Sequence, residues 1–99
     1  MSGIHNNIWD KLRALIKDSK SILLSTHINA DGDGLGSEIA FYYYLKSLDK
    51  ECRIINPTSL PYNYKVIDPD LVVKKYTTDM DQWLEKVDLT IIFDIGDHR

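Results

Sequence analysis

The sequence predicts an α/β fold in which a parallel β-sheet is flanked by helices. Three short apolar runs carry the strand signal, at residues 22–27, 52–56 and 89–94. Helical patterns stand before and between them, and strands that alternate with helices form parallel sheets. At 99 residues the chain is long enough for one small domain with a core and too short for two ordinary domains.

The first predicted helix lies near the start of the chain. Its apolar residues recur at i, i+4, i+7 and i+8, and they are Ile8, Leu12, Leu15 and Ile16. We expect Asn6 or Asn7 to cap it and its stripe to cover apolar surface. Residues 19–21 (Ser-Lys-Ser) end this helix, and "ILLSTH" follows as a short buried strand.

A second helix is expected from about Gly34 to about Asp49. It is apolar on most of its circumference, which indicates burial on more than one side. "CRIIN" at 52–56 reads as a strand that Pro57 stops, because proline has no N–H to donate to a neighbouring strand.

The second half of the chain is less regular. Residues 57–70 carry three prolines and are expected to form loops around one helical turn. "LVVKKY" predicts a short strand, "TDMDQWLEKV" a short helix capped by Thr78 or Asp79, and "LTIIFD" a strand rich in β-branched residues.

Composition and charge restrict the class of protein. A net charge of -3 argues against a basic surface that grips long nucleic acid, although bound metal ions could still attract a small phosphorylated substrate. The longest apolar run is far shorter than the ~18 residues of a membrane span, and no secretory signal opens the chain. The single Cys52 fits a reducing compartment and reads as a buried structural thiol. We therefore expect a cytoplasmic protein without a membrane partner.

Acidic residues crowd the segment "STHINADGDGLGS" at 25–37, directly after a predicted buried strand. His27, Asp31 and Asp33 leave the end of that strand, and Asp94 ends another. Ligands of open α/β sheets bind outside the carboxyl ends of the strands. These four side chains are therefore expected to converge at one edge of the sheet.

Two kinds of loop fit this segment poorly. A phosphate-binding loop needs a different glycine spacing and a Lys-Ser or Lys-Thr, and two carboxylates would repel the phosphates. An EF-hand loop that starts at Asn29 places Gly34 correctly, but Ala40 stands where a bidentate glutamate belongs.

Two interpretations remain. In the first, the segment is only a turn in which Asp33 or Ser37 caps the following helix, which leaves His27 and Asp31 unexplained. In the second, the segment binds divalent metal: His27 and Asp31 hold one ion, Asp33 faces a second, and Asp94 bridges both. Mixed imidazole and carboxylate ligands suit Mn²⁺, Fe²⁺ or Zn²⁺.

The segments "HINADGDGLGS" at 27–37 and "IIFDIGDHR" at 91–99 resemble the DHH phosphoesterase family, in particular its nanoRNase/pAp phosphatase branch. The first motif of that branch reads H-x-N-x-D-G-D-x-x-G-S, and every fixed position is filled here. The resemblance is expected to span the whole chain, residues 1–99, as the N-terminal part of a DHH domain.

The resemblance implies a dinuclear phosphoesterase that uses two Mn²⁺ ions, with Mg²⁺ or Co²⁺ as substitutes. It assigns His27 and Asp31 to the first ion and Asp33 to the second, with Asp94 as the bridge. Asp33 and Asp94 are thus the catalytic candidates. Substrates of the family include short single-stranded oligoribonucleotides and 3'-phosphoadenosine 5'-phosphate (pAp).

Three further residues are candidates for contacts with substrate. Arg99 could reach a substrate phosphate from just beyond the bridging aspartate. Asn29 either fixes the loop or contacts substrate, and His98 is a weaker candidate.

The sequence departs from the family in lacking its third motif, Asp-His-His, and its C-terminal substrate-binding domain. We therefore expect the 99-residue chain alone to hydrolyse little or no substrate, and the full-length parent enzyme to carry the activity, as a homodimer if it oligomerises. The alternative function is a non-catalytic nucleotide-binding or regulatory module that keeps the metal loop.

Overall fold

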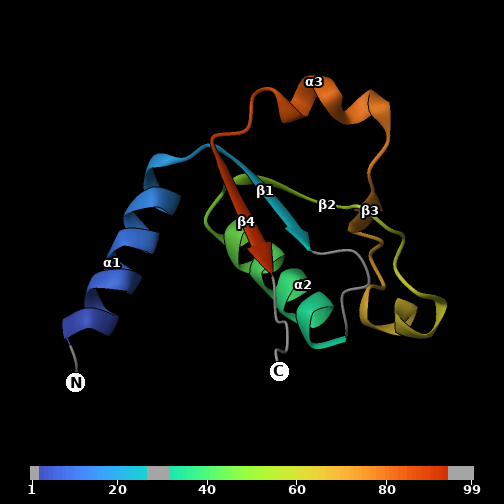
Figure 1. Cartoon of the computed structure of the whole chain (residues 1–99), viewed down its shortest axis with the longest axis horizontal. Coiled ribbons are helices and arrows are strands. Elements are labelled where there is room, and N and C mark those ends of the chain that lie inside the picture. The colour runs from blue at the N-terminus through green and yellow to red at the C-terminus, as the bar shows by residue number, and fades with distance from the viewer. Residues whose placement is uncertain (1–2, 27–31, 94–99) are drawn as a thin grey trace.

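The structure is a computed structural model that describes residues 3–26 and 32–93; of residues 3–7 and 32–33 it describes the backbone. Helices and strands alternate along the chain (Figure 1). In order they are α1 (Gly3–Asp18), β1 (Ser21–Thr26), α2 (Gly32–Ser47), β2 (Glu51–Asn56), the 3-10 helix η1 (Tyr62–Ile67), β3 (Val73–Lys75), the 3-10 helix η2 (Thr78–Met80), α3 (Asp81–Leu84) and β4 (Leu89–Phe93).

The described strands form one sheet in the order β3-β2-β1-β4, and all three pairings are parallel. The predicted α/β class with a parallel sheet is therefore confirmed. β1 lies in the middle of the sheet between β2 and β4, and its last residue, Thr26, is the register partner of Phe93, the last residue of β4. The two strands therefore end at the same level of the sheet.

α2 covers one face of this sheet and forms the core with it (Figure 1). β1 alternates between buried and half-buried positions, and the side chains that face the core, Ile22 and Leu24, are fully buried. Leu45 of α2 and Ile54 of β2 complete the centre of the same cluster. This alternation is what a strand shows when one of its faces is packed.

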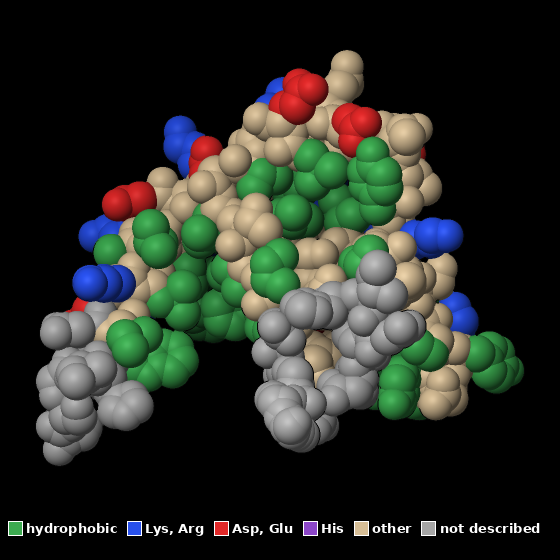
Figure 2. Space-filling model, viewed as in Figure 1, with side chains coloured by type: hydrophobic (Ala, Val, Ile, Leu, Met, Phe, Trp, Pro, Cys, Tyr) green, Lys and Arg blue, Asp and Glu red, His purple; other side chains and the backbone are tan. Residues whose placement is uncertain are grey.

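The opposite face of the sheet is more open. Arg53 of β2 stacks its guanidinium 4.5 Å from the centre of the Trp83 ring, and the Trp83 indole donates a 2.7 Å hydrogen bond to Glu51. On β4, Ile92 is 52% exposed. Figure 2 shows hydrophobic side chains grouped on the side of the molecule in view.

α1 differs from its prediction in two respects. It begins at Gly3, so neither Asn6 nor Asn7 is its cap. Only part of its stripe is covered: Ile16 is buried, whereas Leu15 is 54% exposed. Ile16 belongs to the core cluster and Leu12 packs against it, whereas Ile8 and Leu15 stay exposed to solvent.

The predictions for α2 and for the segment before β4 are also wrong in detail. α2 begins two residues earlier than expected, at Gly32, and buries one side, because Tyr43 and Tyr44 turn outward and are 42% and 46% exposed. The short helix near residue 80 forms as η2 followed by α3, and no side chain of Thr78 or Asp79 caps either. No helix among the described residues is both long and apolar enough to cross a membrane.

Candidate functional site

β1 and β4 end at the same edge of the sheet, and most of the predicted site residues follow these two strands in the sequence. His27 follows Thr26 in the sequence and Asp94 follows Phe93, and Thr26 and Phe93 are register partners on neighbouring strands. Two strand ends more than sixty residues apart in the sequence therefore lie side by side at this edge (Figure 1). We call this edge of the sheet, where β1 and β4 end, the carboxyl rim.

Most of the candidate residues lie outside the described part of the chain. They are His27, Asn29, Asp31, Asp94, His98 and Arg99. Asp33 is described by its backbone alone, in the first turn of α2. Within residues 3–26 and 32–93, no three side chains of His, Cys, Asp or Glu gather as a metal-binding group. The ligand set thus stays a prediction.

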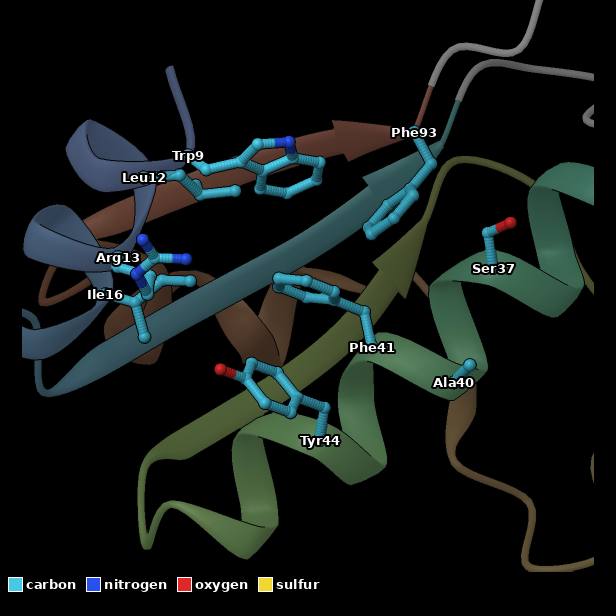
Figure 3. A pocket seen from close by; sticks show the side chains of 9 residues that line it. All are labelled: Trp9, Leu12, Arg13, Ile16, Ser37, Ala40, Phe41, Tyr44 and Phe93. Carbon is cyan, nitrogen blue, oxygen red and sulfur yellow. The ribbon is translucent and has the colours of Figure 1, made fainter. Parts of the chain in front are cut away.

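A groove of about 600 Å³ runs beside the rim between α1 and α2 (Figure 3). Trp9 and Leu12 line its α1 side, and Phe41 and Tyr44 face them from α2. Phe93 closes the end of the groove next to the rim, with its ring centre 5.8 Å from that of Phe41. The lining is mainly apolar, so the groove offers packing surface and few groups for chemistry.

A buried polar pair lies at the end of β2. Glu38 of α2 is fully buried, and Asn56, the last residue of β2, is 2% exposed. Asn56 Nδ2 donates a 3.0 Å hydrogen bond to Glu38 Oε1. The other two oxygens of the pair, Glu38 Oε2 and Asn56 Oδ1, are buried and have no hydrogen-bond partner among the described residues.

Burial changes the acidity of this pair. It raises the pKa of the Glu38 carboxyl from 4.5 to about 7, and the hydrogen bond from Asn56 opposes this rise only in part. The cause is desolvation, because a buried carboxylate loses the water that stabilises its charge. Near neutral pH, a large share of Glu38 therefore carries a proton.

Sequence reasoning did not single out this pair. An isolated glutamate is usually exposed, so Glu38 carries no functional signal of its own in the sequence. A signal was nevertheless present: the apolar residues Leu35 (i−3) and Leu45 (i+7) lie at helical spacing from Glu38, so the period of α2 puts position 38 on the buried face. Nothing in the sequence indicated that Asn56, eighteen residues further on, would be its partner.

Cys52 of β2 and the tyrosines Tyr42, Tyr43 and Tyr44 of α2 make structural contacts. Cys52 is a buried free thiol, as expected, with burial raising its pKa. Of the three neighbouring tyrosines, Tyr42 packs against the core, whereas the Tyr43 hydroxyl donates a 2.6 Å hydrogen bond to Asp70. These contacts fit structural roles.

Comparison with known proteins gives two partial matches, and no family model matches the chain. The bifunctional oligoribonuclease and PAP phosphatase NrnA of Thermus thermophilus is 38% identical over 47 residues, which cover 43% of this chain and 14% of that protein. The crystal structure of an exopolyphosphatase-related protein from Bacteroides fragilis is similar in fold, with a TM-score of 0.78 and 23% identity, over 89% of this chain and 27% of that one.

The chain thus spans well under half the length of both relatives. At 23% identity the second match shows the shared fold alone. The first match is short, but the name of that protein gives the two activities of the branch that the motif at 27–37 resembles. The two motifs and the local sequence match support a DHH-family phosphoesterase fragment, and the solved structure shows the same fold over 89% of this chain.

Proposed function

We propose that this chain carries one half of a two-metal phosphoesterase site. In this proposal His27 and Asp31 bind the first divalent ion, Asp33 binds the second, and Asp94 bridges the two. Asn29, His98 and Arg99 are the candidates for contacts with substrate.

The observation that carries the proposal is the register of β1 and β4. Because Thr26 and Phe93 are partners, the residues that follow them start from neighbouring points of the carboxyl rim. Parallel α/β sheets bind their ligands at this edge. A histidine and three aspartates also form a donor set that Mn²⁺ accepts, which supports a fit to the ions that the family uses.

Bound ions would supply activation of a water molecule and neutralisation of the charge that develops on the phosphoryl group. The chain itself would supply the metal ligands and fix their positions. Asp33 stands in the first turn of α2, whose buried face fixes the helix against the sheet, and Asp94 follows the last residue of β4 in the sequence. Rigid elements of this kind keep ligands in place without a cost in loop ordering.

For the parent enzyme, the proposed reaction is hydrolysis of short oligoribonucleotides or of pAp. The name of the Thermus thermophilus relative supports these substrates. The net charge of -3 fits a small substrate that is attracted by bound ions and not by a basic surface.

Metal titration of single variants tests the proposal. Asp31→Asn and Asp94→Asn each remove one charged ligand, so Mn²⁺ affinity should fall by about tenfold or more in both, as measured by calorimetry. Asp18→Asn is the matched control, because Asp18 is exposed at the end of α1 and should leave the affinity unchanged.

The same variants separate an enzyme site from a simple nucleotide-binding module. If the site is of the proposed type, pAp binding should depend on Mn²⁺ and should weaken together with metal affinity. Undiminished pAp binding by Asp31→Asn in the absence of Mn²⁺ would favour the binding module and contradict the proposal.

A further inference from the structure

The buried pair of Glu38 and Asn56 has a chemical imbalance that the proposed function does not use. An ionised carboxylate offers only acceptors, and the oxygen of an asparagine amide is also an acceptor. In this pair the amide N–H satisfies Oε1, and no other described residue donates to Glu38 Oε2 or Asn56 Oδ1, which are both buried. Leaving both groups unpaired would be costly in a site closed to water.

One proton resolves the imbalance. A neutral carboxylic acid has an O–H, and that O–H can donate to the amide oxygen while the amide N–H donates to the other carboxyl oxygen. Both side chains would then make two hydrogen bonds in a closed ring. The full burial of Glu38 favours the uncharged form for the same reason.

The position of the pair gives it a further consequence. Glu38 lies in the first half of α2, the helix whose first turn contains Asp33, and Asn56 is the last residue of β2. The Asn56 carbonyl also accepts a 2.9 Å hydrogen bond from the Tyr76 amide, which holds this strand end to the chain beyond β3. The pair therefore joins the start of α2 to the carboxyl rim.

We propose that Glu38 and Asn56 form a neutral acid–amide pair that positions α2, and with it Asp33, at the carboxyl rim. Both are positioning residues, since they act through Asp33. This inference rests on the proposed function for its effect on metal binding, whereas the acid–amide pairing itself is independent of it.

Substitutions that imitate or remove the pair test its chemistry. Glu38→Gln has nearly the shape of a neutral acid and can keep both hydrogen bonds, so its melting temperature at pH 7 should lie within about 5 °C of the wild type. Glu38→Leu leaves both polar groups of the Asn56 side chain unpaired, and its melting temperature should be at least about 10 °C lower. If Glu38→Gln is destabilised as much as Glu38→Leu, the pairing is refuted.

The positioning role is tested by the double variant Glu38→Leu with Asn56→Leu. Replacing both partners by apolar groups of similar size should recover most of the stability lost by Glu38→Leu. Mn²⁺ affinity should still fall by about tenfold, because the directional bonds that place α2 are gone, and Glu38→Gln should keep it within about threefold.

A matched control removes a different bond of the same helix. Tyr43→Phe deletes the 2.6 Å bond to Asp70 on the exposed side of α2 and should leave Mn²⁺ affinity unchanged. Wild-type affinity in the double variant would overturn the positioning role. A wild type that binds no Mn²⁺ would overturn the proposed function and the positioning role together, while the melting temperatures of Glu38→Gln and Glu38→Leu would still decide the pairing.

Discussion

At the scale of single residues, the buried carboxyl of Glu38 sets the most specific expectation about pH. Its pKa is raised from 4.5 to about 7, first by burial, and no charged side chain contributes to the shift among the described residues. The folded chain therefore holds a proton on Glu38 over a pH range in which the unfolded chain releases it.

The sign of the pH effect follows from this difference. Glu38 contributes its full stabilisation below pH 4.5 and loses it as the pH rises towards and through about 7. The melting temperature of the wild type should fall relative to that of Glu38→Gln between pH 5 and about pH 8, as measured by circular dichroism. Parallel curves for the two proteins would show that Glu38 is ordinary in its acidity.

The pKa of Asp88 is shifted in the opposite direction to that of Glu38, and Asp88 affects stability at lower pH. It accepts backbone hydrogen bonds from Lys20 (2.9 Å) and Ser21 (3.3 Å), which lower its pKa below 3.8. Its contribution is therefore lost only as the pH falls below that value. Measurements above pH 5 therefore report on Glu38 without interference from Asp88.

At the scale of elements, β1 is the strand that links the other parts of the core. It pairs with β2 on one side and β4 on the other, and its core-facing side chains are fully buried. α2 packs directly over β1 and β2. A change in β1 should therefore affect the whole domain, whereas a change on the open side of α1 should not.

A pair of leucine substitutions measures this difference. Leu24→Ala should lower the free energy of unfolding by about 2–5 kcal/mol, because it removes a fully buried side chain from the core. Leu15→Ala makes the same chemical change at a 54% exposed position of α1 and should cost under about 1 kcal/mol. Urea unfolding of both variants gives the two values, and equal losses would contradict the packing described for β1.

The sequence predicted the elements well and their packing less well. Alternating and continuous apolar runs identified every strand, since a strand with one packed face leaves that pattern in the sequence. The outward turn of Tyr43 and Tyr44 could not be predicted, because a tyrosine joins an apolar ring to a hydroxyl that is satisfied in water. The start of α2 was placed two residues too late, as glycines at 32 and 34 both suit a helix end.

At the scale of the whole molecule, the fold brings the ends of two strands that are distant in the sequence, β1 and β4, to one edge of a parallel sheet. Recognising the motif at 27–37 needed only the sequence, because its residue types and spacing are specific. The register that pairs Thr26 with Phe93 needed the structure, since strand order is not written in any single segment. The Glu38–Asn56 pair likewise appears only when α2 is laid on β2.

The central claim is that Asp31 and Asp94 serve one metal site, and a double-mutant cycle tests it most directly. Calorimetric Mn²⁺ titration would be made on the wild type, Asp31→Asn, Asp94→Asn and the double variant. If both carboxylates hold the same ions, the double variant should lose little more affinity than either single variant. Losses that simply add, or a double variant that keeps the wild-type Mn²⁺ affinity, would contradict a shared site at the carboxyl rim.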